Sequence, residues 1–194
     1  LGVLLHLYYG QRLQAEDLGH LVVYRNRSFS GNPYEAGNDR TFSLDTLPQE
    51  FPSAGVGDYR TGPLGVMNAD GSRAADLRYI SHKITKGKYT LPGLPSLYHN
   101  TPHEAETLEI TLRDDASNLE TALVYGVFPQ QDIITRAVKI TNTGTEPVTL
   151  TRALSVCLDI PFGQCQLMHF HGRPTMERET ERNDIPTGIT PLRS

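Results

Sequence analysis

The sequence predicts an all-β fold, and three observations support this prediction. Apolar and polar side chains alternate in several segments, most clearly in "ETLEITLRD", where Leu108, Ile110 and Leu112 share one predicted face. Turn-forming Gly, Pro and Asn residues separate such segments. No long segment shows the 3.6-residue period of an amphipathic helix. Together these patterns indicate a β-sandwich.

The predicted strands follow one another along the chain. Early candidates are Gly2–Tyr9, Leu21–Arg25 and Leu77–Thr85, and "LQAEDLGHL" predicts one or two helical turns between them. "ALVYGVF" is apolar on both faces, which predicts an interior strand. "IITRAVKITN" and "VTLTRALSV" flank the short loop "TGTEP", and this pattern predicts a hairpin.

The segment "VTLTRALSVCLDI" predicts one long strand. Its apolar face would carry Val148, Leu150, Leu154, Val156, Leu158 and Ile160. Arg152 interrupts this face, and the sequence does not indicate how its guanidinium is satisfied.

Composition limits the class of protein. The 194 residues are enough for one domain with a real core, and 38% hydrophobic and 21% charged residues fit an ordinary globular protein. A net charge of −4 gives no reason to expect nucleic acid or an anionic membrane as a partner. No apolar run approaches the roughly 20 residues that span a bilayer. The two cysteines, Cys157 and Cys165, form no disulfide framework, so we expect a buried free thiol at Cys157 and a reducing cytoplasm.

A histidine pair is the most conspicuous motif. His169 and His171 are two residues apart, so both side chains would lie on the same face of a strand. With Glu177 they resemble the first metal motif of the cupin sandwich. Glu177 is one residue too far from the pair, and no histidine follows His171 to supply the second motif. We therefore expect no metal, and interpret the pair as polar histidines beside a turn.

Carboxylates for glycoside chemistry are present but form no evident pair. Asp114 and Asp115 are adjacent and are predicted to lie in a turn, and Asp70 suits the turn "NADGSR". The remaining candidates are Asp45, Glu50 and Asp58. The sequence contains no serine nucleophile elbow and no phosphate-binding glycine loop. The residues alone identify no enzyme.

Two irregular segments, "RNRSFSGNP" and "GVGDYR", carry side chains that suit sugars. They combine arginine, asparagine and aspartate with aromatic rings, on which the C–H faces of sugars pack. The alternative is that Phe29 and Tyr59 only plug the ends of the sandwich. The second segment forms the end of the longer run "LPQEFPSAGVGDYR". The prolines and glycines of this run exclude regular structure.

Read in order, several segments resemble the N-terminal domain of the family 36 glycoside hydrolases, the bacterial and fungal α-galactosidases or melibiases. They are "LHLYYG", "SFSGNP", "FSLDTLPQEFPSAGVGDYR", "DLRYISHKITKGK", "LPGLPSLY", "ETLEITLRD", "ITRAVKITNTG" and "HFHGRPTMER". The resemblance runs roughly from Leu5 to Arg182. This chain has Tyr59 where the family usually has Phe, and Ala54 where relatives often have an aromatic residue.

The resemblance implies a large antiparallel β-supersandwich of the galactose mutarotase-like type, with few short helices, that forms a single domain over residues 1–194. In the family this domain precedes a (β/α)₈ barrel, so we expect the chain to be a fragment of a longer protein. The implied activity is retaining hydrolysis of terminal α-galactosides such as melibiose and raffinose. Both catalytic aspartates of the family lie in the barrel, so the resemblance implies no catalytic residue and no cofactor here.

The resemblance also implies a bacterial cytoplasmic homo-oligomer, a tetramer, in which this domain contacts its own barrel. Loops Ser28–Pro33 and Pro52–Arg60 would close over a neighbouring barrel. The residues implied to bind the sugar in trans are Asp58, Arg60, Ser30 and Asn32. The alternative for Asp58 and Arg60 is that they pair only to hold the loop or a subunit interface.

A second functional class remains open at this point. The chain would then be a free-standing carbohydrate-binding or cupin-like metal-binding β-sandwich. Metal binding that depends on His169 would distinguish this class from the first.

Overall fold

The computed structural model describes residues 2–10, 12–14, 16, 44, 47–55, 57–97, 101–160, 165–185, 188 and 191. Over these residues it contains strands and no α-helix, which confirms the all-β prediction. No described helix is long and apolar enough to cross a membrane. The chain divides into two compact units, Leu1–Asp159 and Ile160–Ser194, which are described separately.

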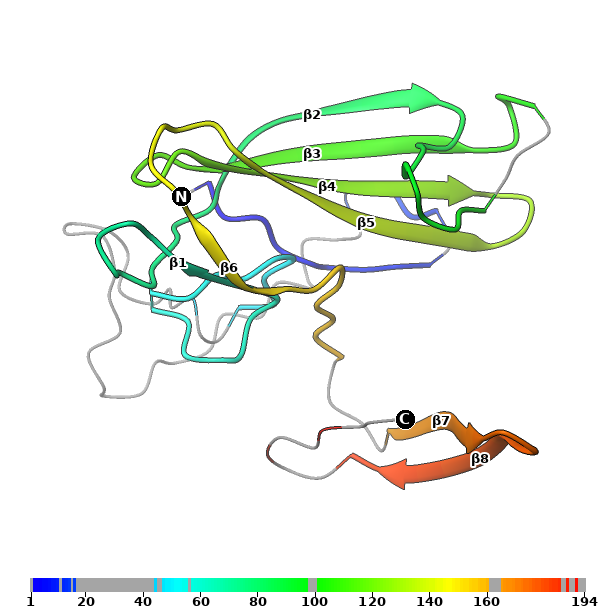
Figure 1. The fold of residues 1–194 in the computed structure, drawn as a ribbon. Helices are drawn as coiled ribbons and strands as arrows, with labels where there is room; N and C mark the ends of the chain where they lie inside the picture. Colours follow the sequence, from blue (N-terminus) through cyan, green and yellow to red (C-terminus); the bar gives the residue numbers. More distant parts are fainter. Residues whose placement is uncertain are drawn as a thin grey trace. The chain divides into compact units, whose positions relative to one another are not determined.

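The first unit contains two antiparallel sheets (Figure 1). One has four strands in the order β2-β3-β4-β5, and the other pairs β1 with β6. The strands are β1 Leu64–Met67, β2 Arg78–Lys86, β3 Glu106–Asp114, β4 Leu119–Phe128, β5 Ile133–Asn142 and β6 Thr149–Ala153. The expected interior strand is β4, which is hydrogen-bonded on both sides, and the expected strands at Leu77–Thr85 and "ETLEITLRD" are β2 and β3.

The core lies between these two sheets. Leu64 and Val66 of β1 face side chains from the four-stranded sheet, including Leu112, Leu119 and Leu123. The remaining buried members of the cluster are Phe51, Ala75, Leu77 and Tyr125. The alternating apolar positions of the strands thus meet in one layer, as a sandwich requires.

The predicted hairpin between "IITRAVKITN" and "VTLTRALSV" is wrong. The two segments are strands β5 and β6, but β5 pairs with β4, and β6 pairs with β1. Thr143 stays attached to the start of β4, since its backbone N–H and its hydroxyl both donate to the Asn118 carbonyl, at 3.0 and 2.6 Å, so the chain does not fold back along β5 there. The loop therefore crosses from one sheet to the other instead of reversing within one.

The predicted long strand after Val148 is also shorter than expected. Strand β6 ends at Ala153, and beyond it Leu154 and Leu158 are each 51% exposed. The alternating pattern continues there without a ladder of strand hydrogen bonds among the described residues. Arg152, which the sequence left unexplained, donates from Nη1 to the Gly62 carbonyl at 3.2 Å.

The N-terminal segment differs from its prediction. Gly2–Tyr9 forms no strand, and its extended pairing is limited to one bridge between Leu5 and Gln49. The predicted strand Leu21–Arg25 and most of the predicted helical segment lie outside the described residues.

The second unit contains the hairpin of β7 Gln166–Arg173 and β8 Met176–Asp184. The register places His169 opposite Glu181 and His171 opposite Glu179. The register shifts after His171, at Gly172, where an added Cβ would lie 2.4 Å from the Met176 carbonyl oxygen. Glycine is therefore required at this bulge.

Leu123 tests the core. Its side chain is fully buried, with 0% exposure, so Leu123→Ala leaves a cavity and is expected to lower the free energy of unfolding by about 3 kcal/mol. Urea unfolding followed by circular dichroism measures this change. The matched control is Ile84→Ala on β2, where the side chain is 65% exposed and the expected change is within about 0.5 kcal/mol. A loss below about 1 kcal/mol for Leu123→Ala would contradict the assigned core.

Candidate functional site

The Asp58 carboxylate is buried in the loop that the sequence singled out. Its side chain is 1% exposed. Oδ1 accepts from the backbone N–H and Nε of Arg60, at 3.0 and 2.9 Å. Oδ2 accepts from Arg60 Nη2 at 2.7 Å and from Gln49 Nε2 at 2.8 Å. Both oxygens are therefore already engaged by donors of the protein.

Arg60 uses the rest of its guanidinium to hold the surrounding chain. Nη2 also donates to the Leu47 carbonyl at 2.7 Å, and Nη1 donates to Asp159 Oδ2 at 2.9 Å. The hydrogen bond to Asp58 is the main cause that raises the pKa of Arg60 above its ordinary value, so the group stays charged. The pair thus serves first to fix the loop, the alternative that the sequence left open.

Tyr59 lies between these two anchored residues and points into solvent, with 75% exposure. The interpretation that Tyr59 plugs the end of the sandwich is therefore wrong. Ser30 and Asn32, together with Phe29, lie outside the described residues. Of the predicted sugar-binding residues, the structure thus brings Asp58 and Arg60 together.

The loop is held by contacts with the segment that precedes β2. The Ser53 hydroxyl donates to the Ala75 carbonyl at 2.5 Å, and the Ala75 N–H donates to the Ala54 carbonyl at 3.0 Å. Gly55 has a φ of +99°, and a Cβ there would lie 2.4 Å from the Ala74 Cβ. A side chain at this position would be strained and would also collide.

Glu50, in the same loop, is the centre of a buried polar network. Oε1 accepts from the hydroxyls of Tyr9 and Tyr125, at 3.1 and 2.6 Å, and from Arg136 Nη1. Oε2 lies 2.7 Å from His6 Nδ1. Burial is the main cause that raises the pKa of Tyr125 and of Tyr9 above the ordinary tyrosine value, and the Glu50 charge adds to it.

Asp70 serves a turn, as predicted, whereas Asp114 ends strand β3 and caps the turn that follows. Asp115 in that turn pairs with Arg113. Asp114 Oδ1 accepts from the Ala116 N–H at 3.1 Å, and Oδ2 accepts from the Ser117 hydroxyl at 2.6 Å. Asp70 Oδ1 accepts from the Ser72 N–H at 2.9 Å. Asp45 lies outside the described residues. Among the carboxylates that the sequence singled out and the structure describes, none forms an open catalytic pair.

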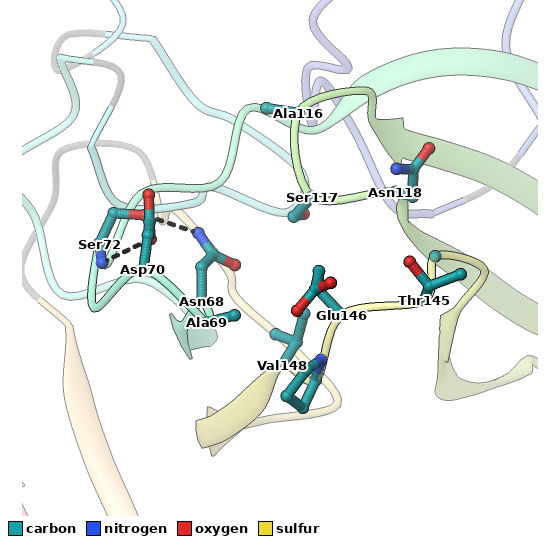
Figure 2. A pocket seen from close by; sticks show the side chains of 12 residues that line it. Asn68, Ala69, Asp70, Ser72, Ala116, Ser117, Asn118, Thr145, Glu146 and Val148 are labelled. Atoms are coloured by element: carbon teal, nitrogen blue, oxygen red, sulfur yellow. Dashed lines mark hydrogen bonds between the residues drawn. The ribbon is translucent and has the colours of Figure 1, made fainter.

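Three loops of the first unit enclose a cavity of about 310 Å³ (Figure 2). Figure 2 shows Ser72 hydrogen-bonded both to Asn68 and to Asp70 on one side, with Glu146 on a second loop. Asn68 Nδ2 also donates to the Ala74 carbonyl at 3.1 Å. The lining residues include no aromatic ring, so the cavity lacks the stacking surface typical of sugar sites.

The histidine pair meets a different carboxylate from the one that the sequence suggested. Glu177 accepts the Thr175 N–H at 3.1 Å, at the turn of the hairpin. Glu181, across the hairpin, instead forms a group of possible metal ligands with His169 and His171. Sequence reasoning missed Glu181 because its proximity depends on the pairing of β7 with β8. The signal that could have found it is the hairpin register itself.

Both cysteines are free, and each is half-buried. The prediction of a free thiol at Cys157 is confirmed, although the residue is not fully buried. Burial is the main cause that raises the pKa of the Cys157 thiol, and the Asp159 charge adds to it. Cys157 is therefore less reactive than an exposed thiol at neutral pH.

Comparisons with known proteins show which family the chain belongs to. Residues 2–194 match the family described as the glycosyl hydrolase family 36 N-terminal domain. The chain is 47% identical over 97% of its length to the bifunctional alpha-galactosidase/sucrose kinase AgaSK of Mediterraneibacter gnavus. It is 40% identical, again over 97% of its length, to the alpha-galactosidase AgaA of Geobacillus stearothermophilus.

Solved structures agree with this assignment. The galactosidase domain of AgaSK has a TM-score of 0.89 at 46% identity, and the match covers 96% of this chain and 26% of that one. An AgaA variant in complex with raffinose has a TM-score of 0.88 at 38% identity, with the same coverage of both chains. The chain therefore belongs to the N-terminal domain family of the family 36 glycosyl hydrolases. It spans 20% of the full length of AgaSK and 26% of AgaA.

The Glu50 network predicts that the free energy of unfolding falls at alkaline pH. The folded-state pKa values of Tyr9 and Tyr125 are raised, while the unfolded chain releases these protons near pH 10. The stabilisation is thus complete below about pH 10 and is lost as pH rises above it. Urea unfolding at several pH values is expected to show this fall, and Tyr125→Phe is expected to flatten it.

The exposed Tyr59 provides the control, because Tyr59→Phe is expected to leave the pH dependence of unfolding unchanged. An equally steep loss of stability in Tyr125→Phe and in the unaltered chain would show that the network does not cause it.

Proposed function

We propose that this chain is the non-catalytic N-terminal domain of a retaining α-galactosidase that removes terminal α-galactosyl residues. The observation that carries the proposal is the family match over residues 2–194. The relatives are alpha-galactosidases, and structures of AgaA variants contain raffinose and stachyose. We infer substrates of the same kind, with melibiose as a smaller example, for the complete protein.

The catalytic carboxylates of this protein are proposed to lie outside the chain. A retaining mechanism uses two carboxyl groups about 5–5.5 Å apart, of which one attacks the sugar and the other transfers protons. Glu50 and Asp58 are buried, and each is paired with an arginine. Neither is placed to attack a sugar or to deliver a proton to it.

The domain is further proposed to lend its loop Pro52–Arg60 to the sugar site of a neighbouring subunit in a cytoplasmic tetramer. Within this loop Tyr59 is the group that is free to contact a sugar, because its ring is exposed and can stack on the C–H face of galactose. Asp58 and Arg60 position that ring through their mutual hydrogen bonds. Ser30 and Asn32 remain proposed contacts from the second loop.

The alternative of a free-standing carbohydrate-binding or cupin-like module has less support. The family match covers nearly the whole chain and assigns it to a domain of larger glycosidases. The cupin interpretation also needed Glu177, whose carboxylate accepts a hydrogen bond at the hairpin turn instead.

The first test of this function compares the 194-residue chain with the complete protein. We expect no hydrolysis of an aryl α-galactoside by the chain alone, and turnover by the complete protein, because no open pair forms among the sequence-selected carboxylates that the structure describes. Release of the aryl group followed by absorbance measures both rates. Turnover by the purified chain, at a rate that follows its concentration, would overturn the proposal.

The second test addresses the loop in the complete protein. Tyr59→Ala is expected to raise KM for raffinose about tenfold, which corresponds to ~1.4 kcal/mol of lost ring contact. Tyr59→Phe keeps the ring and should keep KM within about twofold. Steady-state kinetics, with sedimentation to verify the oligomer, measure these effects.

Asp58→Asn serves as the comparison for a positioning role. It is expected to lower the thermal stability of the loop together with kcat/KM, because Arg60 loses its charged partner. Tyr79→Ala, which removes a part-exposed ring from β2, should leave KM unchanged. If Tyr59→Ala forms the normal oligomer with unchanged KM and kcat, the loop does not reach the sugar.

A further inference from the structure

We propose that His169, His171 and Glu181 form a binding site for a divalent transition-metal cation, best matched by Zn²⁺. These side chains lie on one face of the β7–β8 hairpin and offer two imidazole nitrogens and one carboxylate oxygen. The proposal concerns the hairpin alone and is independent of the sugar chemistry above. It departs from the sequence-based expectation of no metal, which rested on Glu177 and did not include Glu181.

The backbone pairing brings the three ligands together. His169 and His171 alternate along β7, so their rings share a face, with centroids 6.0 Å apart. Glu181 is the direct antiparallel partner of His169, and direct partners also share a face. The arrangement is thus fixed by strand register and does not depend on a long flexible loop.

The distances between the ligand atoms suit a shared cation better than they suit hydrogen bonds. Glu181 Oε2 lies 3.8 Å from His169 Nε2 and 3.7 Å from His171 Nδ1, beyond hydrogen-bonding range. A tetrahedral zinc ion with bonds of about 2.0–2.2 Å holds its ligand atoms roughly 3.3–3.6 Å apart. All three ligand atoms lie within 4.8 Å of one another, so small side-chain rotations complete the site.

One of the proposed ligand atoms, His171 Nδ1, is buried and has no hydrogen-bond partner among the described residues. A buried polar atom without a partner is costly, and a cation at this position would remove that cost. Glu179 Oε2 lies 3.6 Å from the other ring nitrogen of His171, which is also beyond hydrogen-bonding range, so no described carboxylate fixes the orientation of this ring.

Asn183 competes with the proposed cation. Its Nδ2 lies 3.2 Å from His169 Nε2 and donates to Glu181 Oε1, also at 3.2 Å. One amide therefore bridges two of the proposed ligands, His169 and Glu181. A cation would replace this bridge, so Asn183→Ala is expected to retain or strengthen binding.

The donor set selects the class of cation. Two imidazoles with one carboxylate favour Zn²⁺ and its transition-metal neighbours, whereas Ca²⁺ and Mg²⁺ require mainly oxygen ligands. His169 and His171 are partly exposed, at 22% and 39% of their side chains, so solvent can enter and supply the remaining ligands. Three protein ligands with open positions also occur in catalytic zinc sites.

Calorimetric titration of Zn²⁺ into the chelator-treated full chain tests the proposal. We expect one equivalent to bind, and His169→Ala, His171→Ala and Glu181→Gln each to weaken binding about tenfold or more. Glu177→Gln on the same hairpin and His103→Ala elsewhere in the chain are matched controls that should bind normally. Circular dichroism verifies that every variant is folded as the unaltered chain is.

Cobalt absorption identifies the ligands directly. Co²⁺ at this site is expected to give the intense visible bands of low-coordinate nitrogen and oxygen ligation, and Cys165→Ser should leave them unchanged. A sulfur charge-transfer band that disappears in Cys165→Ser would assign the ion to the thiol and overturn the proposal. Binding of Zn²⁺ weaker than about 1 mM, or unchanged in both histidine variants, would overturn it as well.

Discussion

The buried Glu50 carboxylate is the interaction on which the first unit depends, because it joins otherwise separate parts of the chain. His6 and Tyr9 reach it from the N-terminal segment, Tyr125 reaches it from β4, and Arg136 reaches it from β5. A buried carboxylate is tolerated only when its charge is paired and its oxygens accept hydrogen bonds. Glu50 meets this requirement only when all these segments are assembled, so it couples the irregular N-terminal chain to the sheet.

The same loop carries a second buried carboxylate, Asp58, and the two carboxylates stabilise different parts of the loop. Glu50 attaches the loop to the sheet, while Asp58 and Arg60 shape its outer end. Gln49 connects the two, since it lies beside Glu50 and donates to Asp58 at 2.8 Å. The backbone that carries the exposed Tyr59 ring is therefore held in place by the hydrogen bonds of its two neighbours, Asp58 and Arg60. Such an arrangement suits recognition, because little conformational entropy is lost when a rigid aromatic side chain meets a ligand.

The sequence predicted those features that depend on local pattern. Strands β3 and β4 follow from period-two alternation and from a run that is apolar on both faces. The partner of β6 could not be predicted, because alternation specifies which face is buried but not which strand lies alongside. For the same reason the sequence indicated Glu177, which is close to the histidines along the chain, as their carboxylate partner. Glu181 lies beside the histidines only because β7 pairs with β8 in this register. The burial of Asp58 likewise depends on Gln49 and on Arg60 folding back over it.

Burial also separates the carboxylates that maintain the fold from those that can do chemistry. A general acid must hold a proton that it can deliver, and a nucleophile must present a free lone pair to its substrate. Glu50 and Asp58 satisfy neither requirement, because arginines and other donors occupy their oxygens. On the hairpin the situation is reversed: Glu181 Oε2 faces two imidazole nitrogens at distances too long for hydrogen bonds. Asn183 occupies the nitrogen of one imidazole and the other oxygen of Glu181. Within the part of the chain that the structure describes, ligand chemistry is thus expected on the exposed hairpin, where Glu181 Oε2 and His171 Nδ1 lie too far apart to hydrogen-bond, and the buried carboxylates are left to hold the fold.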